Sequence, residues 1–156
     1  YHALPSAADS IDVILEDFSI DGYEIDGSMG AAGEINAWSF LFMGTVVHDG
    51  SSTEIDAVLG VATDMEGTPT VPEDDTTSMT GSIQYATTEG QYIAQITDPL
   101  ILVSECPYPI AGILTYQEVA VHASPVTSID FSTGDCCTAT VSIGTRSQEV
   151  DFCTGG

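Results

Sequence analysis

The chain has 156 residues, 43% of them hydrophobic, and a formal charge of -23 at pH 7, because 24 acids face a single base and lysine is absent. A chain of this length fits one domain with one core. The charge excludes nucleic acid as a direct partner, since binding it requires Lys or Arg to displace condensed counterions, and it disfavours anionic membrane surfaces for the same reason.

The first ten residues, Tyr1 to Ser10, show no helix or turn pattern of their own. The chain begins without an initiator Met, a basic n-region or an apolar h-region, so we expect that a signal peptide has been removed and that the protein is secreted or displayed on a cell surface. We expect residues 1–10 to form an extended arm that completes the sheet edge of a neighbouring subunit, or that docks on its own domain, and residues 11–156 to form a single β-domain.

A hairpin is predicted around Asp21-Gly22, because this dipeptide favours a two-residue turn. Counting outward from the turn places Phe18 opposite Ile25 and leaves both on one apolar face. The same register places Ile14 opposite Met29. The alternation predicts a half-buried hairpin with one polar face.

The polar face of this hairpin carries acids. Asp17 falls directly opposite Asp26, and Glu24 lies two residues along the same face. Like charges opposite one another destabilise a ladder unless something neutralises them, and calcium is a cation that binds carboxylate oxygens. We therefore predict a metal site at Asp17, Glu24 and Asp26, with Ca²⁺ as the candidate cofactor and divalent cations as partners; the alternative is a solvated acidic face.

The dipeptide Asp49-Gly50 predicts a second hairpin, in which an aromatic strand pairs with an aliphatic one. Its register places Phe42 opposite Ala57, near the centre of the expected core. The segment that follows, residues 64–78, is acidic, polar and contains proline. We predict that it is the one long loop of the chain.

Later segments predict further strands. A turn at Glu89-Gly90 places Tyr85 opposite Ala94 on one face of a third hairpin. Residues 110–121 and 126–131 alternate in part and indicate two more strands. Helical periodicity of useful length occurs nowhere.

Four cysteines in a small exported chain indicate two disulfides. A turn at Gly144-Thr145 places Cys136 opposite Cys153 on a non-hydrogen-bonded pair, where the Cα atoms lie about 4.5 Å apart, a separation that a disulfide tolerates. A bond between the adjacent Cys136 and Cys137 would close a strained ring, so this register implies a second bond from Cys106 to Cys137. The swapped pairing is the alternative.

Together these elements predict an all-β fold, an antiparallel meander of about nine or ten strands that forms a sandwich or a barrel and is stapled by disulfides. No apolar run approaches the roughly 20 residues that a membrane-spanning helix needs, so we expect no transmembrane segment.

The segment 128–144 resembles the closing hairpin of exported bacterial β-meander domains of the lipoprotein type. The matching positions are Asp130, Phe131, Cys136 and residues 139–141. Residues 21–27 and 109–116 are also similar to segments of these domains. Ser132 stands where the family has a glycine and Cys137 where it has an aspartate. The resemblance covers about a third of the chain and implies export and an all-β fold, without an activity.

No catalytic motif is present. His2, His48 and His122 lie far apart in the sequence and in no metal-binding spacing, and neither a nucleophile elbow nor a phosphate-binding glycine loop occurs. We predict no catalytic residue and no enzymatic activity; a carboxylate-pair hydrolase is the alternative, because its chemistry needs only two suitably spaced acids.

The leading functional hypothesis is an extracellular structural or adhesive protein, a self-assembling fibre or surface-layer subunit joined to its own copies through the arm at residues 1–10. The alternative is a secreted β-barrel or sandwich module that binds a small ligand or a glycan. In that case the alternating aromatics Trp38, Phe40 and Phe42 would line the pocket, whereas in the structural protein they pack in the core.

Overall fold

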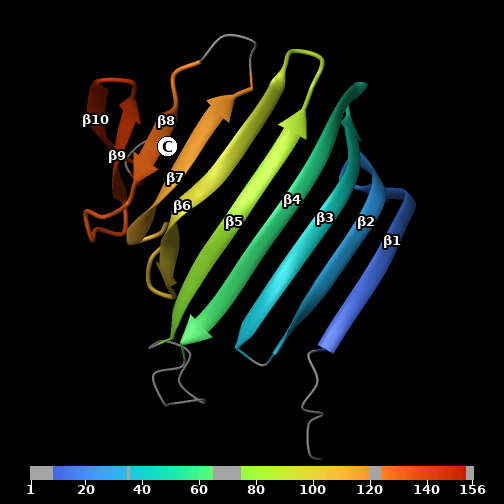
Figure 1. Cartoon of the computed structure of the whole chain (residues 1–156), viewed down its shortest axis with the longest axis horizontal. Helices are drawn as coiled ribbons and strands as arrows, with labels where there is room; N and C mark the ends of the chain where they lie inside the picture. Colours follow the sequence, from blue (N-terminus) through green and yellow to red (C-terminus); the bar gives the residue numbers. More distant parts are fainter. Residues whose placement is uncertain (1–8, 35, 65–74, 120–123, 154–156) are drawn as a thin grey trace, which may run out of the picture.

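The computed structural model describes residues 9–34, 36–64, 75–119 and 124–153. These form one antiparallel sheet of ten strands that follow one another in chain order (Figure 1). No helix occurs in the described ranges, and the predicted all-β meander is confirmed. The strands are β1 (Asp9–Ile20), β2 (Tyr23–Glu34), β3 (Ala37–His48), β4 (Ser51–Asp64), β5 (Thr76–Ala86), β6 (Gln91–Val103), β7 (Ala111–Glu118), β8 (Thr127–Asp130), β9 (Thr138–Ile143) and β10 (Arg146–Asp151).

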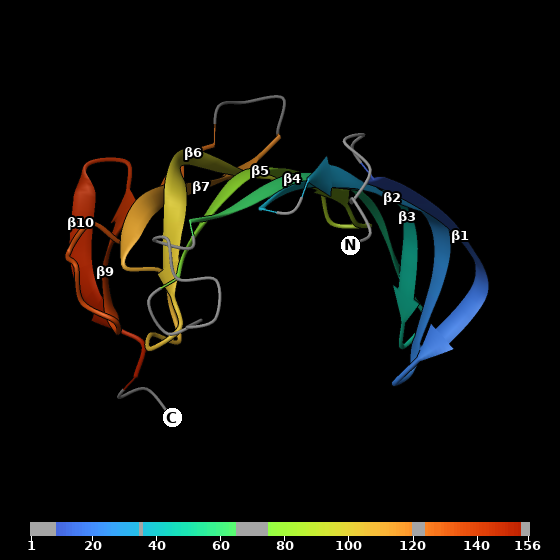
Figure 2. The ribbon, with the colours of Figure 1, turned by 90° about the horizontal axis from the view of Figure 1, so that it is seen from below.

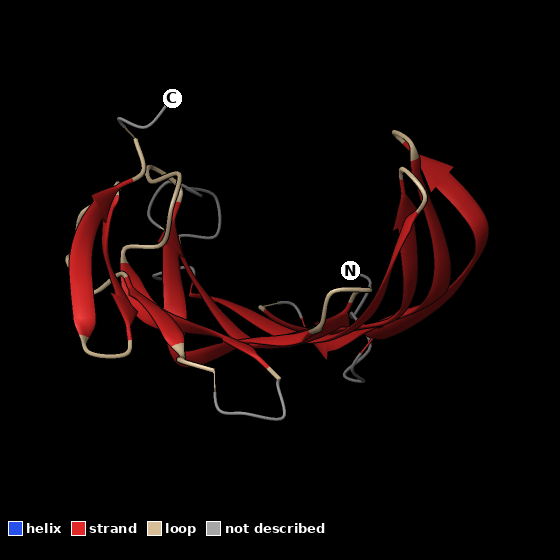
Figure 3. Cartoon of the chain, turned by 90° about the horizontal axis from the view of Figure 1, so that it is seen from above, coloured by secondary structure: helices blue, strands red, loops and turns tan. Residues whose placement is uncertain are grey.

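The sheet is strongly curved, so that its two ends stand opposite one another across an open trough (Figures 2 and 3). β1 pairs only with β2 and β10 only with β9, so the described strands form one open sheet and neither a closed barrel nor a two-layer sandwich. The two edge strands differ in length, since β1 has 12 residues and β10 has 6.

The first hairpin turns at Asp21-Gly22, and Phe18 lies on the predicted rung. Before Phe18, a β-bulge shifts the register by one residue, so Ile14 lies opposite Ser28 and the predicted pair with Met29 is wrong. The shift has a physical reason, because the apolar residues of β1 change frame at this point. The bulge brings five of them onto one face, namely Ile11, Val13, Leu15, Phe18 and Ile20.

The second hairpin has the predicted register around Asp49-Gly50, with Phe42 opposite Ala57. The loop predicted over residues 64–78 is shorter than expected, because β4 takes its first residue and β5 its last three. Residues 65–74 lie outside the described ranges. The predicted arm at 1–10 likewise contributes its last two residues to β1, and the rest of it is outside the described part of the chain.

The third hairpin differs from the prediction by two residues in register. Tyr85 lies opposite Tyr92, whereas its predicted partner Ala94 lies opposite Ile83. The reason is a longer loop, in which the Thr87 N–H donates to the Gly90 carbonyl oxygen at 2.9 Å. A shift of two leaves every side chain on its predicted face, yet it changes which side chains are neighbours.

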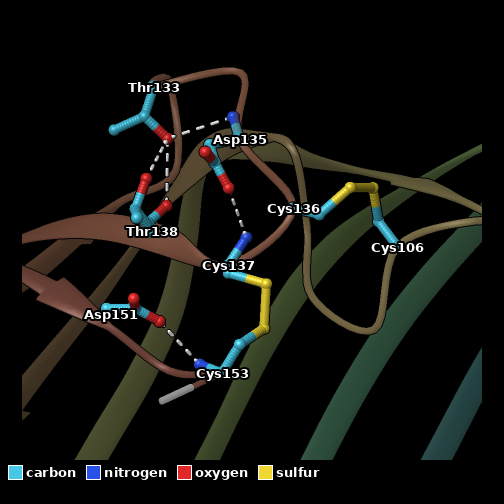
Figure 4. The surroundings of a disulfide bond; sticks show 8 residues. All are labelled: Cys106, Thr133, Asp135, Cys136, Cys137, Thr138, Asp151 and Cys153. Carbon is cyan, nitrogen blue, oxygen red and sulfur yellow. Dashed lines mark hydrogen bonds between the residues drawn. A yellow bond between two sulfur atoms is a disulfide. The ribbon is translucent and has the colours of Figure 1, made fainter.

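The last hairpin also has the predicted register, with Asp151 opposite Thr138. The predicted disulfide pairing is nevertheless wrong. Cys106 is bonded to Cys136, and Cys137 is bonded to Cys153, with Cα atoms 4.9 and 5.4 Å apart (Figure 4). This is the alternative pairing.

Two aspartates explain the difference, because they turn the backbone where the ladder ends. The Phe152 N–H still donates to the Cys137 carbonyl oxygen at 2.8 Å, so the ladder reaches Cys137 but not the predicted rung of Cys136 and Cys153. The Asp135 carboxylate accepts the Cys137 N–H at 2.9 Å, and the Asp151 carboxylate accepts the Cys153 N–H at 2.8 Å. Such side-chain bonds to the backbone two residues on replace the ladder with a turn. The turns bring Cys137 and Cys153 together and leave Cys136 for the Cys106 loop.

The core of the described residues is small and lies at the C-terminal end of the sheet. Its buried members are Leu100, Phe131 and Ala139. Partly buried side chains of β5 to β8 and of the segment after β10 pack against it, namely Met79, Ile96, Leu102, Leu114, Ile129 and Phe152. Strands β1 to β4 contribute no residue to this cluster.

Candidate functional site

The two faces of the sheet differ in chemistry, as the register shows rung by rung. One row of paired residues crosses seven strands on the first face, namely Val13, Met29, Phe42, Ala57, Ile83, Ala94 and Tyr116. A neighbouring row on the opposite face is Asp26, Thr45, Glu54, Ala86 and Gln91. We call the first the apolar face and the second the polar face.

The apolar face is exposed over β1 to β3. Six large side chains on it have exposed fractions between 38% and 57%, namely Ile11, Phe18, Ile20, Tyr23, Met29 and Phe40. We call these six residues the apolar patch. The half-buried Trp38 and Phe42 lie beside them on β3. Contiguous exposed apolar surface of this kind marks an interaction site in a native protein.

The same face is covered at the other end of the sheet by the protein's own side chains. The Phe152 ring lies 6.3 Å from the Phe131 ring and 5.2 Å from that of Tyr108, measured between centroids. No comparable cover exists for the patch within the described ranges, where β1 to β4 pack extensively only against their neighbours in the sheet.

The charges are distributed unequally between the faces. Outside the bulge, the register places on the polar face the acids Asp12, Glu24, Asp26, Glu34, Glu54, Asp56, Asp64, Asp130, Glu149 and Asp151. Among strand residues whose side chains are described, the apolar face receives Glu118 and the bases His48 and Arg146. The apolar face is therefore close to neutral although the chain is strongly acidic.

The predicted metal site is changed by the bulge. Asp17 does not form a rung with Asp26 but lies in the bulge with φ 49°, and its N–H donates to the Asp26 carboxylate at 2.8 Å. Glu24 pairs with Ser19 nearer the turn. No group of three or more His, Cys, Asp or Glu side chains in the described residues is arranged to hold a metal ion. Calcium binding here stays a prediction.

Three tyrosines on the apolar face form a stack that the predicted register did not reveal. The ring centroids of Tyr85, Tyr92 and Tyr116 lie 5.1 to 6.5 Å apart, and the Tyr85 hydroxyl donates to that of Tyr116 at 3.0 Å. Burial, followed by this hydrogen bond, raises the pKa of Tyr85 to about 12. Burial and the nearby Glu118 raise the pKa of Tyr92.

The polar face carries an open groove of about 420 Å³ near the turn between β5 and β6. Its lining includes the polar side chains of Glu54, Asp56 and Gln84 beside the apolar ones of Met43 and Ile93. The aromatic residues that we expected to line a pocket, on β3, do not line this groove; their side chains lie on the opposite face.

Of the three histidines, His48 is within the described ranges. Its ring stacks on Tyr23 with centroids 4.1 Å apart, and its Nδ1 lies 3.6 Å from an Asp49 carboxylate oxygen. His2 and His122 lie outside the described ranges of the chain. No helix long and apolar enough to cross a membrane occurs in the described ranges.

No family model, curated protein or solved structure matches the chain.

Proposed function

We propose that the protein is an extracellular structural or adhesive subunit that assembles with copies of itself. The observation that supports this most is the open sheet, whose apolar face lacks cover over β1 to β3. A single sheet is stable in water only when a second layer covers its apolar face. A subunit that gains this layer by assembly is complete only in the assembled state.

Other features agree with an exterior location. The two disulfides are bonds that persist in oxidising compartments, and the similarity of segment 128–144 to exported bacterial domains points the same way. The charge of -23 favours a medium rich in salt or divalent cations, where repulsion between carboxylates is screened.

Electron microscopy of the purified native protein tests this function. We expect filaments or ordered arrays, and more of them as ionic strength rises, because screening reduces repulsion between subunits. Discrete particles of monomer size at every salt concentration would contradict the proposal.

The groove on the polar face favours a second candidate, a module that binds a glycan. Carboxylates accept hydrogen bonds from sugar hydroxyls, amides both accept and donate them, and Met43 and Ile93 offer apolar contact to the sugar ring. Heteronuclear NMR with neutral oligosaccharides would test it. Shifts confined to the groove residues would support binding, and unchanged spectra at millimolar sugar would exclude it for the sugars used.

A further inference from the structure

We propose that the apolar patch is the surface on which a second copy of this chain packs, face to face, so that two chains form the two-layer sandwich that one chain does not form. This inference rests on the proposed function and assigns the self-contact to one surface. The contact uses side chains of the apolar face, three of them on the edge strand β1, and needs neither the N-terminal arm nor backbone hydrogen bonds along the open sheet edges.

The apolar face of β1 to β4, on which the patch lies, is large enough for a stable pair. Twelve-residue strands at about 3.3 Å per residue, laid about 4.8 Å apart over the four strands β1 to β4, give a face of about 750 Å². A standard interface buries about 800 Å² on each partner. A two-fold pair needs only this one surface, because the same patch is used on both chains.

The charge distribution selects an arrangement in which the apolar faces meet. Two sheets packed face to face are about 10 Å apart, and the acids point away from the contact on both outer faces. At physiological ionic strength the Debye length is about 8 Å, so repulsion between the outer faces is largely screened. Packing through the polar faces would instead bring Glu24, Asp26, Glu54 and Asp56 of both copies together.

The charge also argues against a lipid surface as the occupant. Anionic lipids repel a chain with a charge of -23, and the patch carries no Lys or Arg that would hold a headgroup. The asymmetry of the core points to a protein partner as well. Side chains of β5 to β9, together with Phe131 and Phe152, form a core within the chain, whereas β1 to β4 contribute none to it, and the patch lies on β1 to β3.

A matched pair of variants tests the surface. Phe40 and Leu41 are neighbours in β3 with exposed fractions of 38% and 46%, and they lie on opposite faces of the sheet. Phe40→Glu places a carboxylate in the patch, whereas Leu41→Glu places one on the polar face. Both changes put the same residue into the same strand, so their effects on folding are matched.

Sedimentation equilibrium of the full, disulfide-bonded chain is the measurement. We expect the wild-type chain and Leu41→Glu to dimerise with similar Kd, and Phe40→Glu to raise Kd by at least about 30-fold, which is the loss that removing an interface hot spot causes. Equal dissociation in both variants, or in neither, would overturn the inference.

If the substitutions in β3 prevent folding, a second pair of variants on the edge strand β1 tests the same surface. Ile11 lies on the apolar face and Ile14 on the polar face, with exposed fractions of 57% and 75%. Ile11→Glu should dissociate the dimer and Ile14→Glu should not, while circular dichroism shows both folded. The opposite ranking would overturn the inference.

These experiments distinguish an error in the proposed surface from an error in the proposed function. If Phe40→Glu still forms the filaments or arrays of the wild-type chain, the surface is wrong and the function stands. If the wild-type chain is monomeric and binds neutral phosphatidylcholine vesicles through the patch, a lipid occupant replaces the second copy. If it is monomeric and forms no assembly under any condition, both proposals fall.

Discussion

The disulfide pairing gives the sharpest test of the chain's C-terminal end. The bond between Cys137 and Cys153 spans 16 residues and that between Cys106 and Cys136 spans 30. In the chain-entropy relation these loops correspond to about 3 and 4 kcal/mol of stability. Replacing Cys137 and Cys153 together by Ser should therefore cost about 3 kcal/mol, because one complete bond is lost.

Replacing Cys136 and Cys153 by Ser removes one cysteine from each bond. This variant should lose about 7 kcal/mol, and thiol titration should find two free thiols, those of Cys106 and Cys137. Urea unfolding followed by circular dichroism measures both losses. Thiol titration distinguishes the two pairings better than peptide mapping alone, because the adjacent Cys136 and Cys137 stay on one peptide after proteolysis. A larger loss in Cys137→Ser/Cys153→Ser than in Cys136→Ser/Cys153→Ser would refute the pairing.

Three further predictions follow from the fold. Gly81→Ala should destabilise the protein by about 2–4 kcal/mol in urea unfolding, because φ is 128° and the added Cβ would overlap the Val58 carbonyl oxygen. Gly30→Ala should be nearly neutral, because its Cβ meets side-chain atoms alone, an Asp12 carboxylate oxygen at 3.1 Å and the Leu41 Cβ at 3.9 Å. Equal effects of the two changes would count against the β5 geometry. The Tyr85 phenol should titrate near pH 12 when absorbance is followed at alkaline pH, and at a lower pH in Tyr116→Phe. Because the fold favours the neutral phenol, the stability that this group contributes is present below about pH 10 and is lost as pH rises through about 12. Titration of all tyrosines at ordinary values would contradict the stack. If the acids of the first hairpin bind calcium, the thermal midpoint should be higher in calcium than in chelator at matched ionic strength, and equal midpoints would remove that site.

The sequence predicted best what local turn chemistry and alternation determine. Asp49-Gly50 and Gly144-Thr145 set two-residue turns, and both registers are confirmed along their strands. The change of frame in β1 was visible as well: apart from Ile14, the apolar residues of β1 occupy odd positions up to Leu15 and even positions from Phe18. Only a one-residue bulge reconciles the two frames, and it separates Asp17 from the rung with Asp26.

Other features of the fold could not be predicted from the turn dipeptides. The disulfide pairing depends on the side chains of Asp135 and Asp151, which turn the backbone where the ladder ends, at Cys137. A count from the turn assumes that the ladder continues to Cys136 and Cys153. The stack around Tyr85 depends on a loop that is two residues longer than the dipeptide suggests. The open shape of the sheet is a long-range property, because it depends on whether the edge strands β1 and β10 pair with one another.

The central claim is that a second chain covers the apolar patch, and the single tryptophan reports on it directly. Trp38 lies on the apolar face of β3, two residues from Phe40, and is half-buried in one chain. Its fluorescence should shift to longer wavelength on dilution through the dimer Kd, because water reaches the ring as the chains separate. The Phe40→Glu chain should show the long-wavelength emission at every concentration and Leu41→Glu the wild-type behaviour. Emission that does not change with concentration, from a chain whose mass remains that of a monomer, would contradict the account.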